Sequence, residues 1–247
     1  MKKITKILIG MAGVLILLCL VFVVWGNTPA AAMDVAVEAL TSDKTITVDI
    51  GDWLIFRPDD QPVTTGYIFY PGGRVDYRAY APYARSLALE GYLVVIPKMP
   101  LNLAVFGVNT AEKIIQAYPE IENWVIGGHS LGGSMAASYL YSHPTEIDGL
   151  ILLASYPAES NDLSNYDGEV LSISGSLDGL ATPDKITASV TLLPPQTKWL
   201  VIEGGNHAYF GWYGDQKGDN QAVITREEQQ SQIIQSSLQL LDVVNQE

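Results

Sequence analysis

The chain has 247 residues, of which 48% are apolar and 17% are charged. This length suits one domain, and this composition supplies a sizeable core, which argues against a disordered protein. Fourteen basic and 27 acidic residues give a formal net charge of −13. Because so acidic a chain repels phosphate backbones, we expect no nucleic-acid partner. One cysteine excludes an internal disulfide framework and a four-cysteine zinc site, and three histidines leave little room for a His-rich metal site. We expect neither a metal nor another cofactor.

An uncharged apolar stretch, Ile7–Trp25, begins just after three lysines. As a helix it would be roughly 28 Å long, close to the thickness of the hydrocarbon core of a bilayer. The lysines predict a cytoplasmic N-terminus and an extracytoplasmic remainder, attached to the cell membrane by a single span. Small residues nearby leave open a signal peptide cleaved near Ala32 and a secreted product. We favour a retained anchor, because the stretch is longer than an ordinary signal-peptide core and ends at an interfacial aromatic residue.

The predicted organisation is an anchor (or uncleaved signal) over residues 1–26, a tether over 27–43 and one domain over 44–247. The domain opens with two apolar, β-rich segments and continues with further such segments separated by helical patterns. Near-continuous apolar runs such as YLVVI are typical of strands buried on both faces of a parallel sheet. The predicted strands are Thr45–Asp49, Trp53–Phe56, Gly66–Tyr70, Tyr92–Ile96, Trp124–Gly127, Leu150–Ala154, Val170–Ser174 and Trp199–Ile202.

Helix-length segments lie between the later strands, and a final helix begins at Thr225 and Glu228, which form a capping-box pattern. Two leading strands without a helix between them, followed by alternating strands and helices, predict a mostly parallel α/β sheet with an antiparallel hairpin at its edge. The predicted helices are Tyr77–Leu89, Thr110–Ala117, Leu131–Tyr141, Pro183–Ser189 and a segment from Arg226 to about Val244.

The chemistry centres on Ser130, in the sequence Gly128-His129-Ser130-Leu131-Gly132. This G-x-S-x-G pattern lies between a predicted strand and a small-faced predicted helix. The motif needs that setting, because its serine occupies a strained turn that only glycine neighbours accommodate. Ser130 would therefore project from the C-terminal edge of the sheet as a nucleophile.

A serine nucleophile needs a base, and three histidines are available. His129 is adjacent to Ser130, so its side chain should point away from the serine. His143 ends the following helix and is interpreted as a solvated residue. His207 follows the last predicted strand and reaches the same sheet edge as Ser130, so we predict that it is the base.

Asp178 is the predicted acid, because it follows the seventh strand at that same edge. The order Ser130, Asp178, His207 is the serine–acid–histidine order of α/β-hydrolases. Glu159 and Asp162 are rivals, since they follow the sixth strand, where some members of that superfamily place the acid.

The sequence resembles the α/β-hydrolase superfamily, most of all the small dienelactone-hydrolase-like group and related bacterial hydrolases. The resemblance covers roughly Thr45–Leu241. It implies an eight-stranded α/β-hydrolase fold and a triad that falls on Ser130, Asp178 and His207. Serine stands where a dienelactone hydrolase has cysteine, so that particular substrate is not implied, and the apolar leader lies outside the family's core. The segments that carry the resemblance are Tyr70–Pro82, Gly127–Ala137, Ser174–Pro183 and Gly204–Gly214.

Two backbone N–H groups are expected to form an oxyanion hole. One belongs to Leu131, the residue after the nucleophile. The other should come from the loop after the third strand, where Pro71 has no N–H to donate. Gly72 or Gly73 must supply it, and we favour Gly73. Arg74 is interpreted as a solvated loop residue, with a substrate carboxylate as the alternative partner.

The segment after the sixth strand is too short for a large cap, so an open site is expected. Aromatic residues of the His207 loop either line the substrate pocket or pack the loop. Asp215, Asp219 and Asn220 lack the spacing of a calcium loop. The tentative pocket residues are Tyr156, Tyr209, Phe210 and Met99, with Trp212 and Tyr213 at the rim.

The favoured function is a membrane-anchored serine hydrolase, similar to carboxylesterases, that acts on small acyl esters as a monomer. The same triad could instead transfer the acyl group to an alcohol. A third hypothesis is a hydrolase fold that has lost catalysis and serves as a binding domain.

Overall fold

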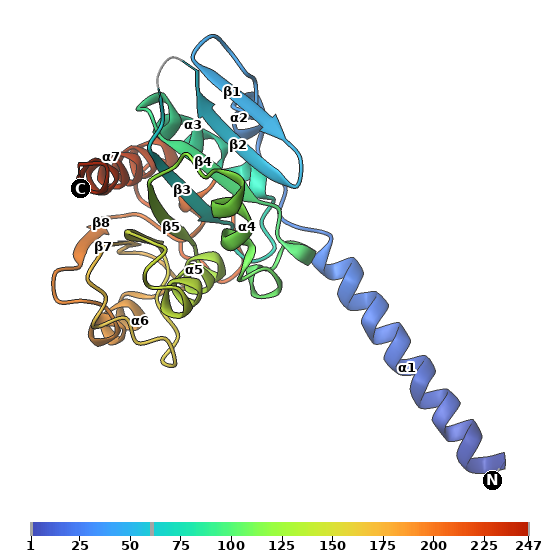
Figure 1. Ribbon diagram of the computed structural model, residues 1–247. Helices are drawn as coiled ribbons and strands as arrows, with labels where there is room; N and C mark the ends of the chain where they lie inside the picture. Colours follow the sequence, from blue (N-terminus) through green and yellow to red (C-terminus); the bar gives the residue numbers. More distant parts are fainter. Residues whose placement is uncertain (1, 60–61, 247) are drawn as a thin grey trace.

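Eight strands form one sheet in the computed structural model, which describes residues 2–59 and 62–246 (Figure 1). Every strand predicted from an apolar run is found, with its ends shifted by at most two residues. The strands are β1 (Ile46–Ile50), β2 (Trp53–Pro58), β3 (Thr65–Tyr70), β4 (Leu93–Pro97), β5 (Asn123–His129), β6 (Gly149–Leu153), β7 (Glu169–Gly175) and β8 (Lys198–Ile202).

The sheet is parallel from β4 through β8 and antiparallel at one edge. Its order is β1-β2-β4-β3-β5-β6-β7-β8. β1 and β2 form the predicted antiparallel hairpin, and β2 also pairs antiparallel with β4. The predicted α/β-hydrolase fold with a mostly parallel eight-stranded sheet is therefore confirmed.

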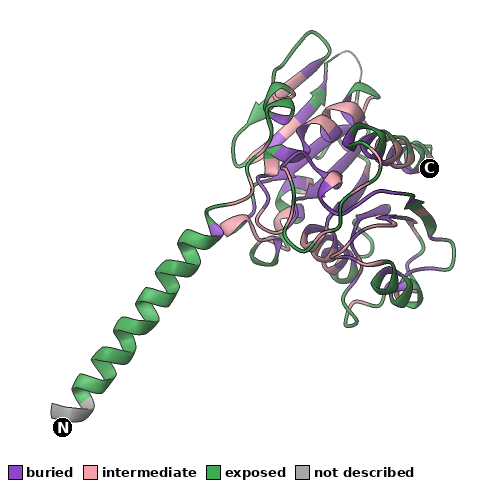
Figure 2. Cartoon of the chain, turned by 180° about the vertical axis from the view of Figure 1, so that it is seen from behind, coloured by how far each residue is buried: buried purple, intermediate pink, exposed green. Residues whose placement is uncertain are grey.

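Alternate side chains of each central strand enter two different cores. In β3, Tyr67 and Phe69 belong to one core, whereas Ile68 and Tyr70 belong to the other. This follows from the two-residue period of a strand. It also explains the continuous apolar runs in the sequence, because both faces of the sheet are covered and buried (Figure 2).

Helices cover both faces. The predicted capping box at the start of α7 is present, with the Thr225 N–H donating to Glu228 Oε2 (2.8 Å) and the Glu228 N–H donating to Thr225 Oγ1 (3.1 Å). Buried residues of α3 and α7 join the first core, and those of α4 and α5 join the second. The helices are α3 (Ala81–Leu89, preceded by the 3-10 turn Tyr77–Tyr80), α4 (Thr110–Ala117), α5 (Leu131–Ser142), α6 (Pro183–Ala188) and α7 (Arg226–Val244).

A long N-terminal helix, α1 (Lys2–Gly26), projects away from the sheet (Figures 1 and 2). Its segment Thr5–Gly26 has a mean hydropathy of 3.2 and buries none of its apolar window. By length and composition, this helix can cross a membrane.

The segment after α1, predicted as a tether, lies against the domain. Ala30 forms a parallel bridge with Val75, and the Met33 N–H donates to the Trp212 carbonyl (2.8 Å). A short helix, α2 (Asp34–Glu38), buries Ala36 completely. These contacts fix where α1 ends relative to the sheet.

Candidate active site

Ser130 occupies a strained turn between β5 and α5. Its φ of 53° and ψ of −122° are unusual for a residue with a Cβ. A Cβ at Gly128 would lie 2.5 Å from the Tyr70 carbonyl oxygen, and a Cβ at Gly132 would collide with the same carbonyl. Glycine is therefore required on both sides of this turn, as the G-x-S-x-G pattern predicts.

His207 and Asp178 form a buried pair. Nδ1 of His207 lies 2.8 Å from Oδ2 of Asp178, and the side chains are 1% and 0% exposed. The other carboxylate oxygen, Oδ1, accepts the N–H groups of Leu180 (2.7 Å) and Ala181 (2.8 Å). The acid is thus held by its own loop and aimed at one nitrogen of the ring. The rivals Glu159 and Asp162 are exposed.

Ser130 and His207 line the same cavity, whose volume is about 300 Å³. His207 Nε2, the ring atom remote from Asp178, is buried and has no hydrogen-bond partner among the described residues. Bonds between a nucleophile and its base are often loose without substrate and tighten when it binds. The lining residues are Ser130, Leu131, Ser134, Ala154, Ser155, Tyr156, Leu180, Ala181 and His207.

His129 packs beneath this site. Its ring centroid lies 4.5 Å from that of His207, and its Nδ1 lies 2.9 Å from the hydroxyl of Tyr80. Burial, reinforced by the nearby His207, lowers the pKa of His129 well below its usual value. His129 is therefore neutral and adds no charge beside the ring of His207.

Tyr80 connects His129 to the loop after β3. Its hydroxyl accepts the Gly72 N–H (3.0 Å), so its own proton is available for His129 Nδ1. Burial raises the pKa of Tyr80 well above its usual value, which keeps that proton in place. Nothing in the local sequence around Tyr80 indicates this role, because sheet topology alone brings the tyrosine beneath the serine turn.

The two residues that are predicted to supply the oxyanion donors, Gly73 and Leu131, are close in space. A Cβ built at Gly73 would be 3.1 Å from Leu131 Cδ2, so the loop after β3 contacts the first residue of α5. Leu131 opens a helix, where N–H groups have no intrahelical acceptor. The N–H group of Gly72 already donates to the hydroxyl of Tyr80. Gly73 is therefore the glycine of this pair whose N–H remains available.

The predicted pocket residues divide between the cavity and the core. Tyr156 lines the cavity with Ser130. Phe210 is 1% exposed and stacks on His129, with ring centroids 5.7 Å apart, and Met99 is also buried in the core. Tyr209 lines a neighbouring pocket instead. Sequence reasoning missed Leu180 and Ala181, which line the cavity. Their backbone N–H groups donate to Asp178 and hold them there, and no sequence motif marks them.

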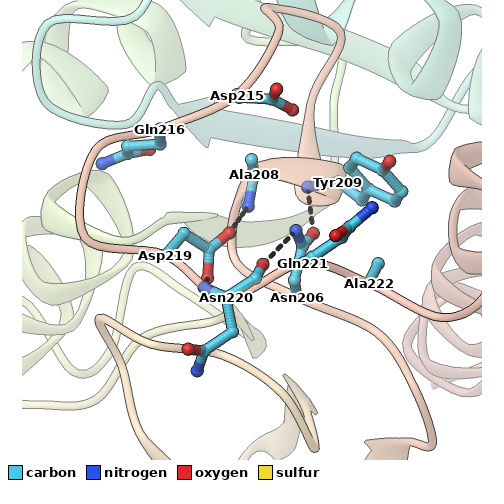
Figure 3. Close-up of a pocket in the computed structure, with 9 residues that line it drawn as sticks. All are labelled: Asn206, Ala208, Tyr209, Asp215, Gln216, Asp219, Asn220, Gln221 and Ala222. Atoms are coloured by element: carbon cyan, nitrogen blue, oxygen red, sulfur yellow. Dashed lines mark hydrogen bonds between the residues drawn. The ribbon is translucent and has the colours of Figure 1, made fainter.

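The neighbouring pocket shows how the His207 loop is held (Figure 3). Asp219 Oδ2 accepts the Ala208 N–H (2.8 Å), and its Oδ1 accepts the Gly179 N–H (3.0 Å). One carboxylate thus joins the residue after His207 to the residue after Asp178. Within the described ranges, no group of three or more His, Cys, Asp or Glu side chains could hold a metal ion.

Helix α7 also forms hydrogen bonds with the His207 loop. Gln229 Oε1 accepts the Asn206 N–H (3.0 Å), and Gln229 Nε2 donates to the Asn206 carbonyl (2.8 Å). Arg226 donates to the carbonyls of Ala208 and Gly211. The backbone on both sides of His207 is therefore tied to a helix, which keeps the ring in register with Asp178.

Comparisons with known proteins agree with this architecture. Residues 66–231, more than half of the chain, match the model of the alpha/beta hydrolase family. No curated protein sequence matches the chain.

Several solved structures share the fold. Est1E from Butyrivibrio proteoclasticus has a TM-score of 0.60 at 11% identity, over 81% of this chain and 98% of that chain. An esterase from the Planctomycetes species Thermogutta terrifontis has a TM-score of 0.56 at 14% identity, over 78% and 90%. A protein assigned as a dienelactone hydrolase from Klebsiella pneumoniae has a TM-score of 0.58 at 14% identity, over 77% and 92%. The extent of the family match, with the sheet order and the strained serine turn, shows that the chain belongs to the alpha/beta hydrolase family.

Proposed function

We propose that the protein is a serine hydrolase of small acyl esters, with Ser130 as nucleophile, His207 as base and Asp178 as orienting acid. The observation that carries this proposal is the buried Asp178–His207 pair, which opens onto the same cavity as a serine on a strained turn. Serine, histidine and aspartate are the residue types that triad chemistry requires, and this supports the proposal.

In the proposed mechanism, Ser130 Oγ attacks the ester carbonyl while His207 Nε2 takes its proton. Asp178 accepts the Nδ1–H bond and stabilises the imidazolium that forms. The alcohol leaves with the proton from His207. Water then attacks the acyl-enzyme while His207 takes its proton, and the carboxylic acid leaves as Ser130 regains its hydroxyl proton. The N–H groups of Leu131 and Gly73 would stabilise the oxyanion, each contributing on the order of 3 kcal/mol to transition-state binding.

The cavity favours a short acyl group. Its volume of about 300 Å³ lies at the small end of ligand sites, and several of its lining residues are apolar. Among the structures of similar fold, the Thermogutta terrifontis esterase has been solved with butyrate and Est1E with ferulic acid. We propose that Tyr156, Leu180 and Ala181 contact the substrate.

We also propose that α1 is a retained membrane anchor, with its N-terminus in the cytoplasm and the hydrolase domain outside. The lysines before the apolar stretch support this orientation. The bridge between Ala30 and Val75 supports retention, because cleavage near Ala32 would remove one of its partners.

A fluorophosphonate probe tests the proposed chemistry. The full chain in detergent should form a covalent adduct at Ser130, because the phosphonyl group mimics the tetrahedral intermediate. Ser134→Ala is a matched control, since Ser134 lines the same cavity but begins no strained turn. It should label normally, whereas Ser130→Ala should not label at all. Equal labelling of Ser130→Ala, or none of the folded wild-type chain, would support a binding domain instead.

A further inference from the structure

The C-terminal end of α1 is held by the loop that follows β3. Arg74 Nε donates to the Trp25 carbonyl (3.1 Å), and its Nη2 donates to the Thr28 carbonyl (2.8 Å). Its guanidinium lies 4.3 Å from the centroid of the Trp25 ring. A cation at the C-terminal end of a helix is favourable, because the last carbonyls have no intrahelical partner. The partly exposed Arg74 side chain thus contacts the end of α1.

A second loop, which follows β4, contacts α1 as well. Asn102 Nδ2 donates to the Gly26 carbonyl (2.9 Å). Further up the helix, the rings of Phe106 and Phe22 meet edge to face, with centroids 6.3 Å apart. Phe22 lies roughly 4.5 Å along the helix axis inside Trp25. When α1 spans a bilayer with Trp25 at its surface, Phe106 therefore lies close to that surface.

The loop that follows β4 is apolar and uncharged where it contacts α1. Val105 and Phe106 are 50% and 53% exposed. The stretch Met99–Ala111 contains no charged residue, although the whole chain carries a net charge of −13. We call the side chains of Trp25, Leu101, Leu103, Val105 and Phe106 the membrane-facing surface. Such a surface suits the boundary between headgroups and acyl chains, whereas the acidic remainder of the domain suits water.

The membrane-facing surface adjoins the candidate active site. A Cβ at Gly73 would lie 3.1 Å from Leu131 and 3.7 Å from Leu103. The loop that offers the Gly73 donor continues directly into Arg74, which holds α1. The loops after β3 and β4 and the serine turn after β5 all leave the same, C-terminal edge of the parallel strands. When α1 spans a bilayer, that edge therefore faces it.

We propose that the membrane-facing surface inserts into the outer interfacial layer of the bilayer and holds the active site against it, so that the substrate is an acyl ester resident in the membrane. This inference rests on the proposed serine hydrolase and on a retained anchor. The substrate class is an amphiphile whose ester group reaches the headgroup layer, where it enters the cavity without crossing bulk water.

Membrane contact is tested first, without reference to activity. In a Cys19→Ser background the chain has no other cysteine, so Phe106→Cys can carry one environment-sensitive fluorophore. The full chain is reconstituted into phosphatidylcholine vesicles containing shallow spin-labelled phosphatidylcholine. Leu89→Cys is the matched control, because Leu89 has the same exposure, 53%, but ends α3 at the opposite edge of the sheet. We expect at least fivefold stronger quenching at position 106, and equal quenching at the two positions overturns the proposal.

The substrate class is tested with two butyrate esters, because the cavity favours a short acyl group. Methylumbelliferyl butyrate is supplied in solution, oleyl butyrate is supplied within phosphatidylcholine vesicles, and released butyrate is measured for both. Val105→Ser/Phe106→Ser should lower turnover of the vesicle-borne ester at least tenfold and change turnover of the soluble ester less than twofold. Leu89→Ser should change neither.

The outcomes separate this inference from the proposed function. Hydrolysis of neither ester by the wild-type chain would defeat the proposed hydrolase, while the quenching result would still decide the membrane contact. Hydrolysis of the soluble ester alone, or of both esters at rates that the double substitution leaves unchanged or lowers equally, would overturn the assignment of a membrane-resident substrate and leave the hydrolase intact.

Discussion

Asp178 uses both carboxylate oxygens, one toward His207 and the other toward its own loop. Asp178→Asn would leave an amide that can keep only one of these acceptor roles, and it would favour the wrong tautomer of His207. We expect ester hydrolysis to fall by about 10⁴-fold with the fold intact. Steady-state hydrolysis of a chromogenic ester measures this loss. Glu159→Gln should be nearly silent because Glu159 is exposed, and the reverse pattern would move the acid to the loop after β6.

Because of His129, the free energy of unfolding should depend on pH below neutrality. Its lowered folded-state pKa means that the unfolded chain binds a proton, below about pH 6.5, that the folded chain refuses. Its contribution is therefore a loss of stability as pH falls, at up to about 1.4 kcal/mol per pH unit. His129→Gln can still accept the Tyr80 proton but cannot be charged. Thermal midpoints in detergent at pH 7.5 and pH 5 should differ less for this variant than for the wild type, and an unchanged difference would contradict the argument.

At the residue scale, sequence reasoning could place candidate residues near one another where chemistry and strand ends coincide. Apolar runs precede Ser130, Asp178 and His207. Because the carboxyl ends of parallel strands lie at one edge of a sheet, these residues are expected at the same edge. Tyr80 and Asp219 follow no such rule. They act through backbone groups of segments that the fold, and not their neighbours in sequence, places beside them.

At the scale of elements, Asp219 joins two loops that must stay in register for the His207–Asp178 bond. Asp219→Asn keeps one acceptor oxygen but replaces the other with a donor, so the bond to either Gly179 or Ala208 is lost. A buried N–H left unpaired costs about 1–3 kcal/mol. We expect a lower thermal midpoint and roughly tenfold slower ester hydrolysis.

Asp215→Asn is the matched control for that experiment. Asp215 lines the same pocket and is exposed. Its carboxylate makes no hydrogen bond to the other described residues, so the substitution should change neither quantity. Equal effects of the two substitutions would show that the charge of the pocket, and not the bridge, supports the site.

Strands and helices were predictable as elements because their signals are local. Apolar runs gave the strands, and the Thr225–Glu228 pattern gave the start of α7. The position of β4 between β2 and β3 was not predictable in this way. Pairing partners are set by long-range packing of whole strands, and alternation of strands and helices leaves their order open.

On the scale of the whole molecule, the residues that follow α1 connect it to the domain through hydrogen bonds. We expect the protein to remain in the membrane fraction after a carbonate wash and to need detergent for release, because α1 is long and apolar enough to span the bilayer. Mass spectrometry of the isolated protein should find an N-terminus before Asn27. A mature protein that begins at Met33 and accumulates in the medium would contradict the retained anchor.

The segment between α1 and α2 should contribute measurably to stability. The Ala30 N–H donates to the Arg74 carbonyl (2.7 Å), and the Asp76 N–H donates to the Ala30 carbonyl (2.9 Å). A fragment that begins at Met33 loses both bonds and the Thr28 carbonyl that holds Arg74.

Each bond contributes about 1 kcal/mol, and 1 kcal/mol shifts the midpoint of a domain of this size by about 2–4 °C. A fragment that begins at Asn27 keeps these partners, so it should melt on the order of 5 °C higher than the fragment from Met33. Calorimetry of the two fragments in the same buffer measures the difference. Equal midpoints would show that the bonds of Ala30 and Thr28 add no stability, and that cleavage near Ala32 would leave the domain unharmed.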